Sequence, residues 1–529
     1  MLSLLVFSPL LFLVIVLVLP SRKSYLFRYL TLTACITQLM VIVYILFSFE
    51  KNSAIQFREQ YDWVTLNLGS AGRLSIEYFL GVDGLNLYML GLSAIVFTIA
   101  AIASWKITEN RRGYHSLFLL MCCSVVGCFA ALDLFLFFIF FEFMLLPMYF
   151  LIGMWGGEKR EYASIKFFLY TLAGSLLILF VMIMLCMSYK DPVKSAELGE
   201  NVHTFNMLYL SDRLNLIDNS PLSVAGDLRW LGWPVRTIAY IMLFTGFLIK
   251  LPSFPFHTWL PDAHVEAPTP VSLILAGILL KIGGYGIMRI VNPVFADVAA
   301  ELSYIAGALG VLSIIYGAMC ALAQKDLKKL IAYSSVSHMG FVLLGISSGT
   351  YEGYNGALFQ MFSHGLLSSL LFLIAGMLYD RTHDRGIENY RGLASRMPKY
   401  TTVAVIAFFA SFGMPGFSGF IGEFLILLGA YTSSDTNGFV PWYYSILALS
   451  GVVLGAVYFL WTLQKMFFSK FWIRIGIRWK EGLYDLNQRE MIMVIPLSTL
   501  TVLLGICPSL ILDAVSSTIN ALVAALSMR

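Results

Sequence analysis

The stretch GFLIKLPSFPFHTWLPDAHVEAPTPVSLILAGILLKIGGYG, residues 246–286, decides the fold of this chain. Two of its lysines, Lys250 and Lys281, each lie inside an apolar segment long enough to cross a bilayer. A lysine at membrane depth costs from about 2.5 to more than 10 kcal/mol, so it persists only where its side chain faces protein or a wet cavity. Burial also favours the neutral amine over the charged one. Both lysines are therefore candidate proton carriers.

The segment between the two lysines cannot form one continuous helix. Proline removes a backbone donor and clashes with the preceding turn, and five prolines lie there: Pro252, Pro255, Pro261, Pro268 and Pro270. Broken helices at membrane depth are tolerated only where the backbone lines a cavity or packs within protein. Together, the buried charge and the break predict a transport path.

The composition of the whole chain agrees with a membrane protein. Its 529 residues are 59% hydrophobic and 12% charged, with a mean hydropathy of +0.79, which is typical of a polytopic helical membrane protein. The net charge of +4 gives no argument for a nucleic-acid partner, because the basic residues lie in short loops. The first apolar run is followed, not preceded, by Arg22, Lys23 and Arg28, which indicates an uncleaved first span.

Redox centres and nucleotide sites are not expected in this chain. Its seven cysteines are scattered through apolar segments, and the cluster CCSVVGC at 122–128 lies within a predicted span without further thiolate partners. No haem attachment motif or iron–sulfur spacing is present. The GGYG sequence at 283–286 lacks the strand–turn–helix context of a dinucleotide site.

Apolar runs of about 20 residues predict an all-α membrane protein of about fourteen transmembrane helices. The predicted helices lie near 2–20, 28–48, 79–104, 116–131, 134–153, 163–187, 237–260, 268–290, 299–323, 328–348, 354–379, 401–431, 444–467 and 490–512.

The basic residues predict the orientation of these helices. They gather in one set of loops and loop-flanking positions: Arg22, Lys23, Arg28, Lys106, Arg111, Arg112, Lys159, Arg160, Lys166, Lys325, Lys328, Lys329, Arg381, Arg385, Arg391, Arg396, Lys399, Lys470, Arg474, Arg478, Lys480 and Arg489. The positive-inside rule therefore places both termini outside the cytoplasm or matrix. The largest hydrophilic insert, residues 188–236, also falls outside and is too short to form a domain with its own core.

An internal symmetry is visible in the order of the predicted helices. Helices four to eight and nine to thirteen form two groups of five, and the fourth member of each group is interrupted, at 248–261 and at 411–424. A charge accompanies each interruption, Lys250 in the first and Glu423 in the second. Because five is odd, the second group enters the membrane from the opposite face, as in transporters built from inverted repeats with broken helices.

This symmetry divides the chain into four parts. Residues 1–115 form a three-helix segment, 116–290 the first five-helix repeat, 291–470 the second, inverted repeat, and 471–529 a cytoplasmic-side loop with a final helix. The second helix of each repeat carries an intramembrane ionisable residue, Glu142 in the first and His338 in the second.

Each of these ionisable residues has a structural alternative. Glu142 either pairs with a cation or is hydrogen-bonded only for packing, and the two lysines could snorkel toward the interface. Glu423 could be a helix cap. His338 and His364 could be satisfied core residues, although the serines around both favour a hydrated row in which imidazole relays protons.

Two further groups are undecided between structure and function. His257 and His264 lie in the proline-rich break and its following loop, where a structural role and a gating role are about equally supported. Lys325, Lys328 and Lys329 begin a helix at the inner interface, and topology or docking explains them as well as proton uptake does.

Two long motifs carry a resemblance to a known family. Residues 246–286 and the run AQKDLKKLIAYSSVSHMGF at 323–341 closely resemble the antiporter-like membrane subunits of respiratory complex I, and the similarity covers nearly the whole chain. Glu423 lies in GMPGFSGFIGEF, where the M-type subunit has glutamate and the L and N types typically have lysine. The best match is therefore the M-type subunit of a proton-translocating NADH:quinone oxidoreductase, the counterpart of mitochondrial chain 4. The insert at 188–236 is longer than this resemblance leads us to expect.

The resemblance implies a role for each candidate residue. Glu142 and Lys250 would form a charge pair, Lys281 would be the central relay, His338 and His364 would continue a hydrated axis, and Glu423 would gate the far side.

The same resemblance implies the partners of this chain. FMN, iron–sulfur clusters and quinone would be held by partner subunits, and no cofactor by this chain. Its neighbours would be the L-type and N-type subunits and lipids, with no nucleic acid. Its length and insert favour a bacterial plasma membrane over a mitochondrial inner membrane. A subunit of a multisubunit sodium/proton antiporter and a non-conducting structural spacer are the alternatives.

Overall fold

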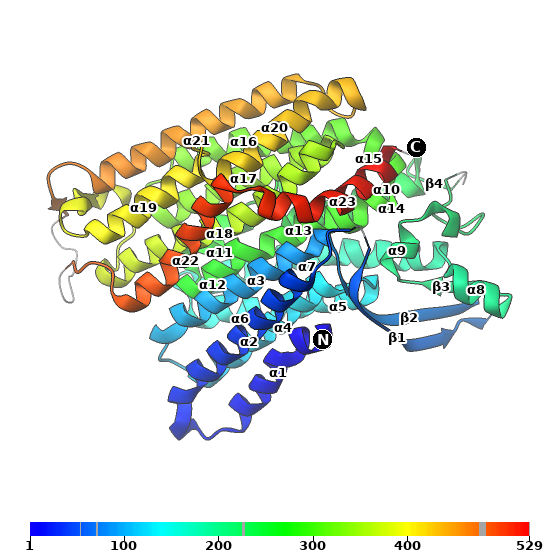
Figure 1. The fold of residues 1–529 in the computed structure, drawn as a ribbon, viewed down its shortest axis with the longest axis horizontal. Helices are drawn as coiled ribbons and strands as arrows, with labels where there is room; N and C mark the ends of the chain where they lie inside the picture. The colour runs from blue at the N-terminus through cyan, green and yellow to red at the C-terminus, as the bar shows by residue number, and fades with distance from the viewer. Residues whose placement is uncertain (53, 70–71, 225–227, 475–482, 528–529) are drawn as a thin grey trace.

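The computed structural model describes the chain except residues 53, 70–71, 225–227, 475–482 and 528–529. Long helices lie side by side in one bundle, and a β-hairpin with several short helices projects from one end of it (Figure 1). Within the described residues, twelve helices are long and apolar enough to cross a membrane. The predicted all-α membrane class is confirmed, while the count of fourteen spans stays a prediction.

All helices of residues 1–294 except the last fall within the parts predicted as the N-terminal segment and the first repeat, a division that stays a prediction. These helices are α1 (Leu2–Val18), α2 (Phe27–Ser48), α3 (Gly84–Ala103), α4 (Arg111–Ala130), α5 (Leu134–Phe143), α6 (Leu145–Trp155), α7 (Arg160–Ser188), α10 (Val235–Lys250), α11 (Trp259–Glu266), α12 (Thr269–Ile274), α13 (Leu280–Gly286) and α14 (Asn292–Val294). Two π-helical turns, η5 (Leu275–Leu279) and η6 (Ile287–Val291), flank α13.

The second repeat and the C-terminal part follow in the same way. Their helices are α15 (Ala296–Glu301), α16 (Ser303–Leu322), α17 (Leu327–Ser347), α18 (Tyr351–Thr382), α19 (Pro398–Ser411), α20 (Ser418–Thr436), α21 (Tyr443–Phe467), α22 (Gln488–Ile506) and α23 (Ser509–Ser527). The basic residues Arg478 and Lys480 lie outside the described residues.

Both predicted helix breaks are present. In the first repeat α10 ends at Lys250, and residues 251–258, which include Pro252 and Pro255, separate it from α11. In the second repeat residues 412–417 separate α19 from α20, and Gly413 and Gly416 there have positive φ values of 77° and 95°. Glycine adopts this left-handed backbone without the steric cost that other residues meet.

Another break was not predicted. The segment expected as one helix over 134–153 is divided at Met144 into α5 and α6. Pro147 explains the division, because its ring clashes with the carbonyl four residues earlier, at Phe143, where α5 ends.

The strands were also not predicted. The expected helix over 79–104 begins only at Gly84, because residues 73–82 form β2 (Arg73–Val82) and Asp83 starts α3 with a capping box. β2 pairs antiparallel with β1 (Gln56–Asn67) and parallel with β3 (Val202–Thr204), which belongs to the insert. The hairpin and the insert therefore form one outer cap and not two separate loops.

The C-terminal part holds two helices where one final helix was expected. Pro508 lies between α22 and α23, and α23 packs against α3 and α18. Thr518 of α23 accepts a hydrogen bond from the backbone N–H of Gly84, which begins α3. α23 is thus attached to the start of α3.

Burial distinguishes the central helices from the peripheral ones. The most apolar windows of Thr269–Val294 and Tyr351–Thr382 are 100% buried and that of Leu327–Ser347 is 94% buried, against 33% for Ser21–Ser48 and Tyr443–Phe467. The three central segments carry Lys281, His338 and His364. Peripheral helices expose apolar faces, as helices in contact with lipid or neighbouring membrane subunits do.

Candidate functional site

Lys281 lies at the centre of the molecule with no exposed surface. Its Nζ donates a hydrogen bond to the backbone carbonyl of Ala276, in the π-helical turn η5, and lies 2.8 Å from Nδ1 of His364. A π-turn displaces backbone carbonyls from the regular ladder, and such turns are frequent at functional sites. The alternative that Lys281 snorkels toward the interface is wrong, because its amine ends against buried groups.

A row of ionisable groups continues from Lys281 through the second repeat. The rings of His364 and His338 have centroids 5.4 Å apart, and Nδ1 of His338 lies 3.2 Å from Oε1 of Glu423. Gln360 Nε2 also lies 3.3 Å from the same Nδ1 of His338. The structure thus brings together four residues that the sequence predicts to be functional: Lys281, His364, His338 and Glu423.

The row is polar along its length. A cavity of about 10 Å³ beside it is lined by Ser334, Ser335, His338, Gln360, His364, Ser368 and Ser411, among others. That space is of the order needed for a single water molecule, which requires about 10–15 Å³. Hydroxyl groups and one water could bridge the histidines there, and the hydrated row stays a prediction.

Glu423 is not a helix cap. It is the sixth residue of α20, whose first turn contains no acidic residue, and Phe417 occupies the N-cap position. Its side chain is almost completely buried and reaches His338. The capping alternative for Glu423 is therefore wrong.

Lys250 and Glu142 form a second group that the structure does not join by an ion pair. Lys250 is 2% exposed, and its Nζ has no hydrogen-bond partner but lies 4.2 Å from the ring centroid of Phe141. Oε1 of Glu142 is also buried without a partner, although Glu142 as a whole is only half-buried. The two residues influence each other through space and not through direct contact.

The two histidines near the first break are both buried. His257 packs edge-on against Tyr316, and its Nδ1 has no partner. His264 in α11 has no exposed surface; both ring nitrogens lack partners, and its ring stacks on Phe372 at 4.5 Å. Lys328 and Lys281 both act electrostatically on His264.

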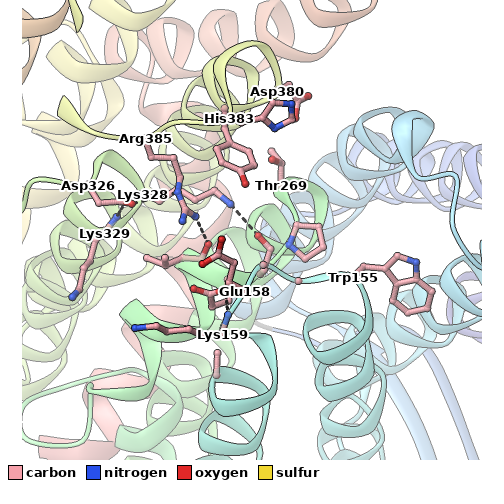
Figure 2. Close-up of a pocket in the computed structure, with 18 of the residues that line it drawn as sticks. Trp155, Glu158, Lys159, Thr269, Asp326, Lys328, Lys329, Asp380, His383 and Arg385 are labelled. Atoms are coloured by element: carbon pink, nitrogen blue, oxygen red, sulfur yellow. Dashed lines mark hydrogen bonds and ion pairs between the residues drawn. The ribbon is translucent and has the colours of Figure 1, made fainter. Parts of the chain in front are cut away.

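A polar cavity of about 910 Å³ opens on the face that bears the basic loops, which we call the inner face. It lies at the junction of the two repeats, and we call it the inner vestibule (Figure 2). Ion pairs cross it from Lys106 to Asp380 at 2.6 Å and from Arg385 to Asp326 at 3.3 Å. Its wall is therefore charged and wettable.

Lys328 forms part of the inner end of this vestibule. It is 3% exposed, and its Nζ donates a 2.9 Å hydrogen bond to the carbonyl of Ala267, directly after α11 (Figure 2). Arg385 donates a 2.5 Å hydrogen bond to the carbonyl of Val265, in the last turn of α11. Lys328 and Arg385 thus both hold the C-terminal end of α11.

Sequence reasoning missed two buried polar residues, one that contacts the row and one that pairs with Asp83. Gln360 lies in ALFQMFSHG, four residues before His364 on the same helical face, which is a signal that could have identified it. Arg289 lies eight residues after Lys281 and forms 2.6 Å hydrogen bonds to both carboxylate oxygens of Asp83. A charged arginine at membrane depth is costly, as a lysine is, so Arg289 could have been identified by the same argument.

Among the described residues, no group of three or more His, Cys, Asp or Glu side chains could hold a metal ion. The cysteines of the 122–128 cluster are buried within α4. The candidate chemistry of the site therefore rests on amines, imidazoles and carboxylates.

Comparison with known proteins agrees with this arrangement. Residues 131–448 match the family model "NADH:quinone oxidoreductase/Mrp antiporter, TM". The NADH-quinone oxidoreductase subunit M of Rickettsia felis is 39% identical over 529 residues, which cover 98% of each chain.

Solved structures show the same fold. A chain of respiratory complex I from Thermus thermophilus superimposes with a TM-score of 0.80 at 31% identity, covering 99% of this chain and 100% of that one. A chain of the Mrp complex from Dietzia reaches the same TM-score at 19% identity, with 99% of each chain covered, which shows a shared fold alone.

These likenesses and the many apolar helices show a multi-pass protein of the bacterial inner membrane. Glu423 of α20 favours the M type over the lysine-bearing types. The relative named above is an M subunit, in agreement with this. The chain belongs to the family of M subunits of NADH:quinone oxidoreductase, the antiporter-like membrane subunits of respiratory complex I.

Proposed function

We propose that this chain translocates protons across the membrane along the buried row Lys281–His364–His338–Glu423, driven by redox chemistry in other subunits. The observation that carries the proposal is the run of contacts along this row: 2.8 Å between Lys281 Nζ and His364 Nδ1, packed His364 and His338 rings with centroids 5.4 Å apart, and 3.2 Å between His338 Nδ1 and Glu423 Oε1. All four side chains are buried. A spacer needs no such row, and an unused buried charge would be expensive to retain.

The contacts give each group a role in proton transfer. A protonated Lys281 can donate its proton to Nδ1 of His364 along their hydrogen bond. Because each imidazole has two nitrogens, it can accept a proton on one and release a proton from the other. Nδ1 of His338 can accept from the Gln360 amide when unprotonated and donate to Glu423 when protonated.

Glu142 and Lys250 would supply the switch. Widening their separation from about 3 to 7 Å at an effective dielectric constant near 20 changes their interaction by about 3 kcal/mol. Moving one proton against 100 mV costs about 2.3 kcal/mol, so a switch of this size is adequate. In the structure neither Lys250 Nζ nor Glu142 Oε1 has a partner, which agrees with the separated arrangement.

Access from the inner face would run through the inner vestibule. Lys328 is a buried amine in its lining, and the electrostatic effect of both Lys328 and Lys281 on His264 supports a path past this imidazole. Reorientation of these side chains, with one or two waters between them, would deliver a proton to Lys281.

The driving chemistry would reside elsewhere in the complex. FMN, iron–sulfur clusters and quinone would be bound by partner subunits, and the L-type and N-type subunits would be membrane neighbours. The half-buried Glu142, on a helix whose next residue Phe143 is 56% exposed, is well placed to sense a neighbouring subunit.

The experiment that tests the proposal replaces Lys281. Lys281→Ala and Lys281→Arg should both reduce NADH-driven proton pumping in membrane vesicles to below about a tenth of the parental rate, a loss of about 1.4 kcal/mol. The arginine variant keeps the charge but is effectively never deprotonated.

Assembly of the complex is the control, measured from subunit levels and from NADH oxidation with an artificial electron acceptor. If Lys281→Arg pumps as well as the parent, Lys281 is a fixed charge and not a carrier. Full pumping in both variants would leave the spacer alternative as the better account.

A further inference from the structure

The insert of residues 188–236 ends in a small hairpin that exposes large apolar side chains. Its strands are β4 (Arg229–Trp230) and β5 (Trp233–Pro234), which pair antiparallel with Trp230 opposite Trp233. Trp230 and Trp233 are each 57% exposed, and Leu231 at the tip is 82% exposed. Two tryptophans and a leucine thus form one apolar tip, which we call the WLGW tip (residues 230–233).

The backbone of the WLGW tip is unusual for the residues it contains. Leu231 and Gly232 have φ values of 52° and 83°, so the turn has the left-handed geometry that asparagine and glycine favour. A branched apolar residue in that conformation costs about 1–2 kcal/mol. Packing inside this chain does not compensate that cost, because the Leu231 side chain is exposed.

The covalent position of the tip sets its depth in the membrane. α10 rises by about 1.5 Å per residue, so Val235 lies about 22 Å from Lys250 along the helix, while half of a hydrocarbon core measures about 15 Å. If Lys250 lies near the midplane, the start of α10 is in the headgroup region. Trp233 is two residues before Val235 and therefore within about 7 Å of it.

The surroundings of the tip are continuous with a membrane-facing surface. Val235 and Ile238 of α10 are partly exposed, and Ile241 is 43% exposed, which marks one apolar stripe along that helix. Arg229 is exposed, and no residue in the described part of the chain forms an ion pair with it. Tryptophan is enriched at membrane–water interfaces, where its ring meets acyl chains and its N–H meets polar groups.

We infer that the WLGW tip is an interfacial anchor that seats on the phospholipid headgroups of the leaflet on the insert's side. Trp230, Leu231 and Trp233 enter the interface, and the Arg229 guanidinium binds a lipid phosphate. The anchor fixes the insert immediately before α10, the helix that carries Lys250. This inference is independent of whether the chain pumps protons.

Photocrosslinking in the assembled complex tests the anchor. Leu231 is replaced with p-benzoyl-phenylalanine, native membranes are irradiated, and adducts on the tip peptide are identified by mass spectrometry. The matched control is the same replacement at Leu198, a 50% exposed leucine at the end of α8 (Pro192–Leu198), with the acidic Glu197 and Glu200 beside it. Acidic neighbours disfavour contact with an anionic lipid surface.

The anchor predicts phospholipid adducts at position 231 that exceed those at 198 by at least about fivefold, since aromatic residues concentrate at the interface. Adding Trp230→Ser and Trp233→Ser should reduce the adducts at 231 severalfold. A protein adduct at 231 would identify a partner subunit as the occupant and overturn the proposal. Equal lipid adducts at the two positions, or none at either, would overturn it as well.

Discussion

Lys250 is buried and Glu142 is half-buried, yet Lys250 Nζ and the buried Oε1 of Glu142 both lack a polar partner. An uncompensated pair of this kind is expensive at membrane depth, so its retention favours a second arrangement in which the two groups meet. A change in the position of α5 or of the turn after α10 would produce that arrangement. The structure thus supports a pair that opens and closes more than a permanent ion pair.

The first prediction concerns this pair. Glu142→Gln should reduce proton pumping and coupled quinone reduction strongly, because the neutral amide cannot stabilise a protonated Lys250. Glu142→Asp retains the charge and should keep much more of both activities. Vesicle pumping at equal subunit content measures the difference, and unchanged pumping in the glutamine variant would contradict the pairing.

The second prediction concerns Glu423. Since its carboxylate contacts Nδ1 of His338, Glu423→Gln should lose most pumping, because an amide cannot take up the proton. Glu423→Lys places a proton-accepting amine there, as in the other two antiporter-like subunits, and should preserve partial pumping. The ranking of the two variants in one vesicle assay decides the matter: a glutamine variant more active than the lysine variant argues against proton handling.

The residues of the row could be predicted from the sequence, while their contacts could not. Lys281, His338 and Glu423 are conspicuous because charge and imidazole are rare in apolar runs. Their neighbours depend on tertiary packing: the bond from Lys281 to His364 joins residues 83 positions apart. Gln360 and the Ala276 carbonyl attract no notice in the sequence, because an amide and a backbone group carry no charge.

At the scale of elements, proline and glycine predict the helix breaks correctly, whereas apolar runs predict helix boundaries less accurately. The breaks at 251–258 and 412–417 follow from local backbone chemistry. The sequence predicts the last residues of strand β2, 79–82, as the start of a helix, because FLGV is apolar and runs directly into α3. Its pairing with β1 and β3 decides the conformation, and such long-range pairing overrides local propensity.

The third prediction concerns the outer cap formed by the hairpin and the insert. Lys194 in α8 (Pro192–Leu198) joins the two, since its Nζ donates to Ser75 at 2.7 Å and to Glu77 at 3.0 Å. Lys194→Met should destabilise the cap by about 1–3 kcal/mol, because the buried Glu77 loses its cation. Hydrogen exchange of the β1–β2 amides should accelerate accordingly.

Lys190→Met is the matched control for Lys194, because no residue in the described ranges forms an ion pair with Lys190. Equal exchange rates in both variants would contradict a stabilising role of the Lys194 contacts.

Burial opposes the charge of Lys194, but its bonds to Asp62 and Glu77 outweigh this and raise its pKa above the ordinary value. A raised lysine pKa means that the stabilisation is complete below about pH 10.4 and is lost only above it. The contacts of Lys194 should therefore persist near neutral pH.

At the scale of the molecule, polar groups extend from the inner vestibule to the second repeat. Lys328 lines the vestibule, Lys328 and Lys281 both act electrostatically on the buried His264, and the row runs from Lys281 to Glu423. The outer cap covers the opposite end, where Asp83 and Arg289 form a buried ion pair. Under the proposed function, this layout would let protons approach the central lysine from the inner face, while paired charges lie at the opposite end.

The last prediction tests that approach. Lys328→Met preserves most of the side-chain volume but removes the amine, and should reduce pumping to below about a fifth of the parental rate, a loss of about 1 kcal/mol. Lys328→Arg keeps a donor for the Ala267 carbonyl and keeps the charge, yet it cannot release a proton, so it should pump almost as poorly. The neighbouring Lys329 lines the same vestibule, and Lys329→Met should pump normally. If Lys328→Arg restores parental pumping, Lys328 serves to tie down the loop after α11, and protons reach Lys281 by another path.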